Sequence, residues 1–383
     1  MSSSKVSIKK TLPVFMSFAV MGFVDIVGVA TVYIKNDFGL ADNLAQLIPS
    51  MALFWFFVLS VPSGLLQDRI GKRNMLNIGM LLTSVGMVIP FFHYSFPVML
   101  AAFIVLGIGN TIVQVSANPL LHDVSPKSKY SSYMSLSQFI KAIISLLGPI
   151  ITTVMATVFG DWKLVFAIYA ITSILSVIWL YFTQIEEEQS TGGTATFKSC
   201  FSLLNNKFIL FMVLGIFMLV GSDVGMNSNI ANLLQNKFGL TLNNASLGIS
   251  LYFTALMIGR FSGAVILNWI SARRFLLLTA IIALISMVGL LAAPTVLFAQ
   301  IAIFMIGLGS ANLFPLIFSI ALEKMPGRPN EVSGLMIMAV SGGAFIPPVM
   351  GLVSSGFGVV TSFIVLVVCM IYLVSLAIYA LKK

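Results

Sequence analysis

Four charged side chains lie inside long apolar stretches of the sequence, where an unpaired charge is costly. They are Asp25, Lys141, Asp223 and Arg260. A charge at the centre of a lipid bilayer costs roughly 2.5–3.5 kcal/mol even on the most lenient insertion scale. Because the four charges cancel, two internal ion pairs are the least costly arrangement. We therefore expect Asp25 to pair with Lys141 and Asp223 to pair with Arg260.

The predicted Asp25–Lys141 pair is the one whose chemistry suits the reversible binding of a cation. Burial favours the neutral form of both an aspartic acid and a lysine, so either side chain can exchange a proton when water reaches it. Alternatively, Asp25 binds Na⁺ together with backbone carbonyls and hydroxyl groups. Arginine stays charged in proteins, so the Asp223–Arg260 pair is equally consistent with a fixed link between helices. Asp223 is a further candidate ligand for the cation.

Uncharged polar and aromatic side chains in the same apolar stretches are candidates for holding a polar, uncharged ligand. Amides supply hydrogen-bond donors and acceptors, and an aromatic face covers the apolar side of such a ligand. Each aromatic is also explained by ordinary packing, since the chain holds 31 phenylalanines and 4 tryptophans. The candidate substrate-binding amides and aromatics are Gln114, Gln138, Asn227, Asn229, Asn232, Asn312, Trp55, Tyr252 and Phe314, and the charged Lys141 is added to them.

The composition indicates which elements must position these side chains. Of 383 residues, 58% are apolar and 9% are charged, and the mean hydropathy is +1.04. A soluble globular protein carries about 25% charged residues, so lipid must surround most of this chain. A helix needs roughly 20 apolar residues to cross the hydrocarbon. Such runs predict twelve spans, near residues 11–34, 45–66, 74–94, 96–120, 130–158, 163–183, 208–235, 244–270, 274–293, 295–322, 331–356 and 359–381.

Lysine and arginine are distributed unevenly over the connections between these spans. Outside the spans, all but Lys35, Lys163 and Lys237 lie near the two termini or in the connections that follow even-numbered spans. Connections rich in lysine and arginine face the cytoplasm, which predicts a cytoplasmic N-terminus and C-terminus. The formal net charge of +9 thus reflects topology, and we expect no nucleic-acid partner. No cleavage site follows the first apolar run, which is expected to remain as a span.

The cysteines and histidines argue against a metal centre or a disulfide framework. Cys200 lies in a polar connection and Cys369 in the last apolar run. His93 and His122 are assigned to different connections. Clusters of these residue types are what zinc sites and disulfide scaffolds require. We expect no metal and no cofactor.

An internal repeat divides the chain into two halves. Asn36-Asp37-Phe38-Gly39-Leu40 returns as Asn236-Lys237-Phe238-Gly239-Leu240, and Gly107-Ile108-Gly109 returns as Gly307-Leu308-Gly309. A polar stretch that includes Glu186, Glu187 and Glu188 separates the two copies. Repeated halves of this kind are typical of carriers that bind a solute at the midplane. The predicted domains are residues 1–184, a cytoplasmic linker 185–207, and residues 208–383.

The connection between the second and third spans carries a motif of fixed spacing. From Gly64 to Arg73 it reads G-x-x-x-D-R-x-G-K-R. The first glycine allows two helices to approach closely, the second makes a tight turn, and the aspartate can pair with basic side chains or a helix end. We expect this network to stabilise one conformation. The predicted gating and structural residues are Gly64, Asp68, Arg69, Gly71, Lys72, Arg73 and, in the eighth span, Arg260.

This motif is similar to the cytoplasmic signature of the major facilitator superfamily. The resemblance implies an all-α membrane fold with twelve transmembrane helices in two pseudo-symmetric six-helix bundles. Within the superfamily the chain resembles the fucose permease and glucose/galactose transporter family of sugar:cation symporters. That resemblance is carried by Ser116-Ala117-Asn118-Pro119, Gly259-Arg260-Phe261-Ser262-Gly263, Phe314-Pro315 with Phe318-Ser319, and Gly342-Gly343 with Pro347-Pro348 and Gly351.

Two positions depart from the pattern of that family. The family carries a glutamate five residues before the proline of the fourth span, where this chain has Gln114. Glutamine cannot titrate, so the proton-binding acid that the resemblance implies is absent there. Asp25 lies about one turn away from the family's aspartate in the first span. Coupling through the family's usual proton relay is therefore in question.

The residues and the resemblance together predict a cation-coupled importer of a monosaccharide or sugar derivative in a bacterial inner membrane. The coupling ion would be H⁺ or Na⁺. Such a protein rocks two bundles about a central site and breaks no covalent bond, so we expect no enzyme activity and a monomer in the bilayer. Three alternatives remain: an exporter or antiporter of amphipathic compounds, which the 21 methionines would suit, a carrier of an anionic metabolite that uses Lys141 and Arg260, and a non-transporting sensor.

Overall fold

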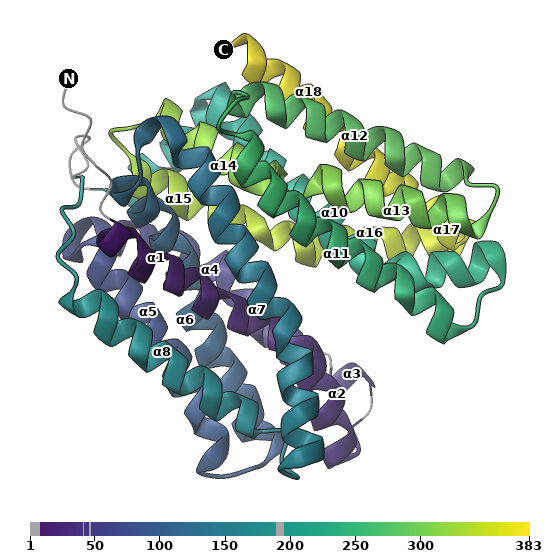
Figure 1. The fold of residues 1–383 in the computed structure, drawn as a ribbon, viewed down its shortest axis with the longest axis horizontal. Coiled ribbons are helices and arrows are strands. Elements are labelled where there is room, and N and C mark those ends of the chain that lie inside the picture. Colours follow the sequence, from purple (N-terminus) through teal and green to yellow (C-terminus); the bar gives the residue numbers. More distant parts are fainter. Residues whose placement is uncertain (1–7, 41, 46, 189–194) are drawn as a thin grey trace. The chain divides into compact units, whose positions relative to one another are not determined.

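The computed structural model describes residues 8–40, 42–45, 47–188 and 195–383, and these ranges contain helices and no strand (Figure 1). Within them, twelve helical segments are long and apolar enough to cross a membrane. The predicted all-α, twelve-span architecture is confirmed. Part of the predicted linker, residues 189–194, lies outside the described residues.

The described chain forms two compact units. Unit 1 comprises Met1–Tyr130, Ser137–Ser202 and Met325–Met338, and unit 2 comprises Ser131–Leu136, Leu203–Lys324 and Ala339–Lys383. The helix at 329–338 therefore packs with unit 1 although it follows the tenth span in the sequence. The predicted division into residues 1–184 and 208–383 describes the repeat in the chain and stays a prediction.

The helices of unit 1 include the first six spans. Among them α5, α6 and α8 lie side by side (Figure 1). The bounds are α1 Ile8–Met21, η1 Gly22–Ile26, α2 Val27–Phe38, α3 Asp42–Ala45, α4 Leu47–Ile70, α5 Lys72–Val88, η2 Ile89–Phe91, α6 Phe96–Val124, η3 Lys127–Lys129, α7 Tyr130–Val158 (of which 131–136 pack with unit 2), α8 Leu164–Phe182, α9 Phe197–Ser202 and α15 Pro329–Met338.

The helices of unit 2 include the last six spans, apart from α15. Here α12 packs against α13 and α18, and α10 packs against α11, α16 and α18. The bounds are η4 Leu203–Asn205, α10 Lys207–Phe238, α11 Leu242–Ile266, α12 Ala272–Ala292, α13 Val296–Ser310, α14 Leu313–Lys324, η5 Ala339–Ser341, α16 Gly342–Phe357, α17 Val359–Ser362 and α18 Ile364–Lys382.

Local sequence signals explain where several of these helices begin and end. The side chain of Asn206 caps α10 by accepting a hydrogen bond from the backbone N–H of Phe208, and Thr295 caps α13 through Phe298. Such side chains satisfy backbone donors that have no partner within the helix. The repeated glycines Gly39 and Gly239 end α2 and α10 in the left-handed conformation, with φ of 60° and 67°, as expected of a C-terminal glycine.

The internal repeat is visible in how the helices touch. In unit 1, a Cβ added to Gly107 would lie 2.4 Å from the carbonyl oxygen of Ala52, and in unit 2 a Cβ on Gly307 would lie 2.7 Å from that of Tyr252. Only glycine permits helices to approach so closely. The two contacts are related by the same offset as the sequence repeat, so the halves repeat in packing as well as in sequence.

Within the described residues, three spans are interrupted near their middle. The first span changes from α-helix to a 3₁₀ segment at η1, between α1 and α2. The tenth span breaks at Ala311–Asn312, between α13 and α14, and the eleventh passes through η5. Backbone groups released at such breaks must find other partners inside a membrane, and broken helices recur at the solute sites of transporters.

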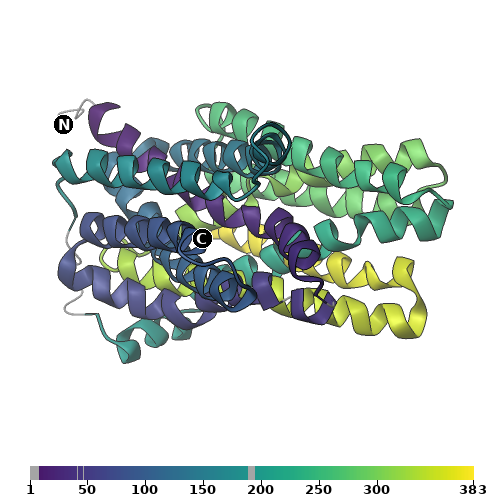
Figure 2. The same cartoon turned by 90° about the horizontal axis from the view of Figure 1, so that it is seen from below.

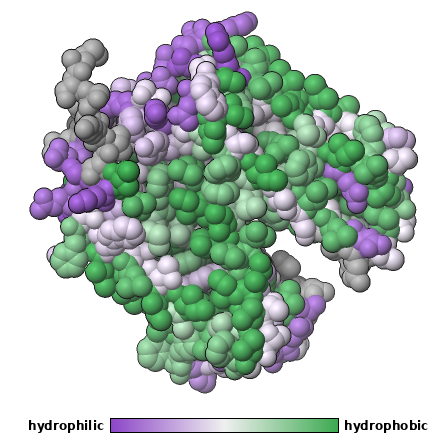
Figure 3. Space-filling model, in the orientation of Figure 1, coloured by the Kyte–Doolittle hydropathy of each residue, from purple (hydrophilic) through white to green (hydrophobic). Residues whose placement is uncertain are grey.

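The long sides of the spans present apolar side chains to the surroundings. Exposed residues there include Phe54, Phe57 and Val58 of α4 and Ile171, Leu175 and Ile178 of α8. Figure 3 shows apolar side chains covering much of the visible face, with hydrophilic ones gathered towards the ends of helices. This pattern is what lipid as the surrounding solvent demands.

Candidate functional site

Asp25 lies in the 3₁₀ interruption of the first span. Its side chain is exposed and accepts a hydrogen bond from the hydroxyl of Ser145 on α7. The same hydroxyl is also within hydrogen-bonding distance, 2.9 Å, of the carbonyl oxygen of Lys141, one turn earlier in α7. An accessible carboxylate, a hydroxyl and a break in the helix thus meet at one place in unit 1.

The predicted pair between Asp25 and Lys141 is not formed. Among the residues that the structure describes, Lys141 makes no ion pair, and its side chain is half-buried. The backbone explains the proximity of the two elements: a Cβ on Gly22 would lie 2.9 Å from the Lys141 carbonyl oxygen. The helices therefore touch as expected, but Ser145, one turn further along α7, is the residue that reaches Asp25.

A chain of amides runs along α6 beside this interruption. Gln114 is buried and donates from Nε2 to Oδ1 of Asn110 at 2.9 Å. Asn110 in turn donates from Nδ2 to the carbonyl oxygen of Met21 at 2.9 Å, immediately before η1. Asn118 donates to the backbone oxygen of Gln114 at 2.8 Å. The Gln114 amide is thus linked, through Asn110, to the point where the first span changes its helix type.

In unit 2, Asp223 is joined to a tyrosine. The hydroxyl of Tyr252 donates to Oδ1 of Asp223. The predicted Asp223–Arg260 pair stays a prediction. Tyr252 is only 1% exposed, so in this structure its ring is packed and does not offer a face to a ligand, contrary to its predicted stacking role.

The remaining predicted substrate residues differ in how accessible they are. Gln138 and Asn312 are buried, and Asn312 donates from Nδ2 to the carbonyl oxygen of Gly259 at 2.6 Å beside the break in the tenth span. Asn229 donates to the Gly225 carbonyl oxygen at 2.9 Å. Half-buried positions, which ligands can reach more easily, belong to Asn227, Asn229, Trp55 and Phe314, whereas Asn232 is exposed.

The signature motif builds a second cluster at the inner end of unit 1, defined as the end where α4 stops and α5 starts. A Cβ on Gly64 would lie 2.7 Å from the carbonyl oxygen of Asn330, so the glycine allows α4 and α15 to touch. Asp68 accepts hydrogen bonds from Nδ2 of Asn330 at 2.9 Å and from the backbone N–H of Ala195 at 3.1 Å. The motif therefore connects α4 to α15 and to the end of the linker.

Glu187 of the linker closes the N-terminus of α5. Its carboxylate accepts the backbone N–H groups of Lys72 at 2.5 Å and Arg73 at 3.0 Å. A negative group at a helix N-terminus is favourable because the first N–H groups lack partners and the helix dipole is positive there. Arg73 also donates to the carbonyl oxygen of Thr183 at 2.7 Å. The linker is thus fastened to the motif by its first residues.

Lys72 is the buried centre of this network. Its ammonium lies 2.6 Å from Oδ2 of Asp123, with side-chain exposures of 2% and 1%, and it donates to the carbonyl oxygen of Glu188 at 3.0 Å. The exposed Lys127 pairs with Glu188 at 2.7 Å. Partial burial of Glu188 would raise its pKa, but the hydrogen bond and charge of Lys127, with His122 and Lys72, lower it.

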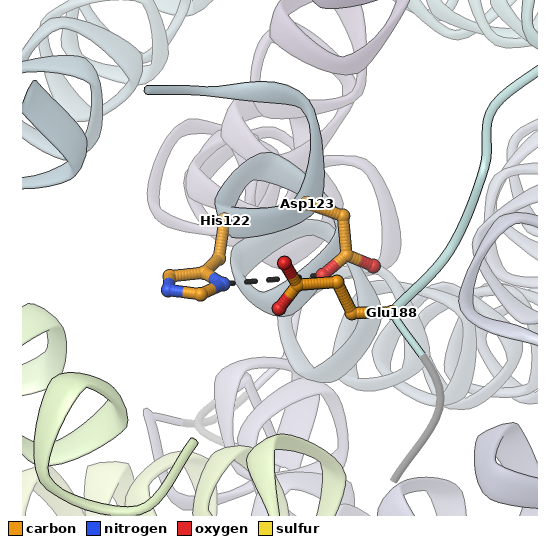
Figure 4. Close-up of side chains that lie close together, drawn as sticks. All are labelled: His122, Asp123 and Glu188. Atoms are coloured by element: carbon orange, nitrogen blue, oxygen red, sulfur yellow. Dashed lines mark ion pairs between the residues drawn. The ribbon is translucent and has the colours of Figure 1, made fainter. Parts of the chain in front are cut away.

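His122, Asp123 and Glu188 converge at the same place (Figure 4), with one ligand-type atom from each lying within 4.8 Å of the others. These residue types can hold a divalent metal. Each carboxylate, however, already has a lysine partner, so a metal would add charge to a network that is balanced. We interpret the cluster as an ion-pair network, and the absence of a metal stays a prediction.

Asp37 organises the outer end of unit 1, where α2 stops and α6 starts. It accepts hydrogen bonds from the hydroxyl of Tyr94 and, at 2.9 Å, from Nε1 of Trp162. Burial and the contact with Asp37 raise the pKa of Tyr94. At the repeat position in unit 2, Lys237 donates to the carbonyl oxygens of Leu290 and Leu291. At equivalent positions of the repeat, the acidic Asp37 and the basic Lys237 thus each form hydrogen bonds to neighbouring helices or connections.

Substitution of Gly71 by alanine is expected to destabilise the inner-end network by about 1–3 kcal/mol. Gly71 has φ of +91°, and a Cβ would lie 3.2 Å and 3.3 Å from the two carboxylate oxygens of Glu187. The loss of stability is measured by thermal unfolding in detergent. The readout is the reaction of a maleimide dye with the thiols of Cys200 and Cys369, which are buried in the folded protein. Gly28→Ala is the control, because nothing lies within 4 Å of a Cβ there; an equal effect of both substitutions would contradict the assignment.

Asn110, Ser145 and the capping role of Glu187 were not predicted from the sequence. Asn110, Gln114 and Asn118 recur at intervals of four residues, which places them on one helix face, so the amide chain had a detectable signal. Ser145 had the same kind of signal, one turn after Lys141. The role of Glu187 had none, because its partners lie more than 100 residues away in the chain, with separations of 115 and 114.

Comparison with known proteins gives a consistent result. The model of the Major Facilitator Superfamily matches residues 14–348. The glucose/galactose transporter of Brucella abortus is 26% identical over 356 residues, which cover 89% of this chain and 86% of that protein. The L-fucose-proton symporter of Escherichia coli is 19% identical over 361 residues, covering 85% of this chain and 82% of that protein. These matches extend through both halves of the repeat.

Solved structures agree with the fold. A crystal structure of the Escherichia coli fucose:proton symporter superposes with a TM-score of 0.86 at 18% identity and covers 98% of this chain and 99% of that one. A proton:xylose symporter structure superposes with a TM-score of 0.77 at 14% identity. The predicted major facilitator fold is confirmed.

Proposed function

Since the chain belongs to the major facilitator superfamily, we propose that it imports a monosaccharide or a close sugar derivative, driven by the entry of H⁺ or Na⁺. As a member of this superfamily it is a multi-pass membrane transporter rather than an enzyme. We further propose a bacterial inner membrane as its location, with both termini in the cytoplasm, because lysine and arginine concentrate near the termini and in the connections after even-numbered spans, and such connections face the cytoplasm.

The substrate class is supported by the relatives and by the polar groups in the spans. Relatives that match nearly the whole chain are named as a glucose/galactose transporter and a fucose-proton symporter. Sugars are bound by neutral hydrogen-bonding groups, and Gln114, Asn227 and Asn229 supply amides inside the spans. Asn110 is added to this set, because it holds Gln114 by a hydrogen bond.

The coupling proposal rests on one observation, the position of Asp25. An ionisable residue within a span is costly unless it serves a function or is paired, and Asp25 is exposed with a serine hydroxyl as its partner. It lies at a helix break, where backbone carbonyls become available to a cation. Gln114 cannot take up a proton, which leaves Asp25 as the acid of unit 1 best suited to bind the coupling ion.

A carrier for an anionic metabolite is the second candidate, and Lys141 favours it. Within the described chain this half-buried lysine has no acidic partner, so its ammonium is available to a carboxylate or phosphate. Counterflow assays distinguish the sugar transporter from the anion carrier. Counterflow of a sugar that anions do not inhibit supports the sugar transporter, and counterflow of an anion supports the anion carrier.

The test is transport by the purified protein in proteoliposomes. A panel of labelled hexoses, fucose and small carboxylates is offered, with Na⁺ and pH gradients imposed one at a time. We expect accumulation of one sugar class above equilibrium under one of the two gradients. Absence of uptake and counterflow for every sugar would overturn the substrate class, and equilibration without accumulation under both gradients would overturn the coupling.

Substitution of Gln114 by glutamate is expected to make uptake depend on pH, falling as the pH rises. The protonated glutamate can donate to Oδ1 of Asn110 as the amide now does at 2.9 Å. The ionised form has no proton to donate and would place two oxygens in contact without a hydrogen bond. Initial uptake rates between pH 6 and pH 8, compared with the wild-type chain, measure the effect; parallel pH profiles would contradict it.

A further inference from the structure

The short linker helix α9 has two different faces. Phe197 and Phe201 are 55% and 44% exposed, and their spacing of four residues puts them on the same side of the helix. Cys200 is buried, and this burial, beside Glu331, raises the pKa of its thiol to about 12. Exposed apolar side chains that lie together on a polar connection indicate a surface that is covered by a protein or a membrane.

The position of α9 is set by hydrogen bonds to the start of α15. The hydroxyl of Ser199 donates to Oε1 of Glu331 at 2.5 Å, and Arg328 donates to the carbonyl oxygen of Ser199 and pairs with Glu331. The hydrogen bond to Glu331 raises the pKa of Arg328, which keeps it charged. Helix α9 also contacts α4, and Figure 2 shows it at the lower left, beside the inner ends of unit 1.

This position is the level at which spans leave the hydrocarbon. Helices α4 and α15 are both parts of membrane spans, and α9 contacts both of them, meeting the first turn of α15 through Ser199 and Glu331. Leu66, in the last turns of α4, is 45% exposed, so apolar surface continues from the lipid-facing side of unit 1 to its inner end. Helices that lie in the membrane interface carry Trp, Phe or Leu on the face that enters the boundary between headgroups and acyl chains.

Two basic side chains, one on α4 and one on α9, have no partner among the described residues. Within the described ranges, Arg69 at the end of α4 has no hydrogen-bond or ion-pair partner for its guanidinium, in contrast to Lys72 and Arg73 of the same motif. Lys198, on α9 itself, is exposed and likewise forms no ion pair with described residues. Basic side chains beside an amphipathic segment are attracted by anionic lipid headgroups.

We propose that α9 anchors the linker in the membrane interface. Phe197 and Phe201 insert at the boundary of the acyl chains, and Lys198 and Arg69 contact anionic phospholipid headgroups. The anchor holds Ser199 against Glu331 and so connects the lipid composition to the inner-end network. This proposal concerns the surface of unit 1 and is independent of the transported substrate.

The test measures membrane depth by spin labelling. In a chain with Cys200 and Cys369 replaced by alanine, a nitroxide is attached to a cysteine placed at position 197, 201 or 198, and the protein is reconstituted in vesicles of phosphatidylglycerol and phosphatidylcholine. At positions 197 and 201 we expect collisions with oxygen to exceed those with a water-soluble nickel complex several-fold. At position 198 the ratio is expected to reverse.

Two outcomes would overturn the proposal. Equal access of the nickel complex at all three positions would put α9 in water, and shielding of positions 197 and 201 from both reagents would indicate a protein partner.

A second experiment tests the contacts with headgroups. Phosphatidylglycerol added to the detergent-solubilised protein is expected to raise its thermal unfolding midpoint, and the double substitution Arg69→Gln with Lys198→Gln is expected to remove most of that increase. Lys129→Gln, an exposed lysine elsewhere in unit 1, is the control.

Discussion

Asp25→Asn is expected to abolish uphill accumulation while leaving exchange of substrate across the membrane intact. The asparagine keeps the shape of the side chain and can still accept the hydrogen bond from Ser145, so the first span and α7 remain in contact. It has lost the negative charge that would bind H⁺ or Na⁺. The expected internal concentration falls from above the external one to equality, since a carrier without its coupling ion only equilibrates its substrate.

The measurement combines two assays on the same proteoliposomes, gradient-driven accumulation and counterflow. Ser145→Ala is the matched control, because it removes the hydroxyl but keeps the carboxylate. It is expected to retain accumulation while requiring a higher concentration of the coupling ion. Normal accumulation by Asp25→Asn would exclude Asp25 as the coupling site, and loss of counterflow would instead show that Asp25 binds substrate or supports the fold.

Lys72→Met is expected to cause the largest loss of stability in unit 1. Lys72 and Asp123 form a pair at 2.6 Å with exposures of 2% and 1%. Removal of one partner leaves a buried, uncompensated charge, which costs about 3–5 kcal/mol. In thermal unfolding this corresponds to a decrease in the midpoint on the order of 10 °C. The dye that reacts with the buried thiols of Cys200 and Cys369 follows the transition.

Lys127→Met provides the matched comparison for that experiment. Lys127 also belongs to the inner-end network and lies 2.7 Å from Glu188, but the side chains are 70% and 46% exposed. Exposed ion pairs contribute about 0–1 kcal/mol, so its midpoint is expected to stay close to that of the wild-type protein. The double substitution Lys72→Met with Asp123→Leu should recover part of the loss, since it removes both charges. Equal losses for Lys72→Met and Lys127→Met would contradict the role of burial.

Features that depend on local chain properties were predictable. Hydrophobic runs located the spans, because the length of a span is set by the thickness of the bilayer. The motif from Gly64 to Arg73 indicated a close helix contact and a tight turn, and the structure has both, at Gly64 and at Gly71. The repeat was visible as matching residues, and its glycine contacts recur in the packing of both units.

Features that depend on the rotation and depth of one helix against another were not predictable. Successive turns of a helix are about 5.4 Å apart along its axis, so an error of one turn in depth changes which side chain meets a partner. For that reason Ser145, and not Lys141, contacts Asp25. Tyr252 has a suitable ring for stacking, yet only its neighbours in unit 2 determine that the ring is packed and that its hydroxyl is bound to Asp223.

The sequence by itself determined that lipid surrounds this protein, where its spans lie and that it has two related halves. These features could be predicted because the length of apolar runs and the repetition of residues are properties of the chain itself. The tertiary structure decided which polar groups meet. Glu187 closes the start of α5, and Lys72 is enclosed with Asp123, only because the linker and the end of α6 come together there in space. A polar group inside a membrane protein takes the partner that packing brings within about 3 Å, and that choice is made by the whole fold.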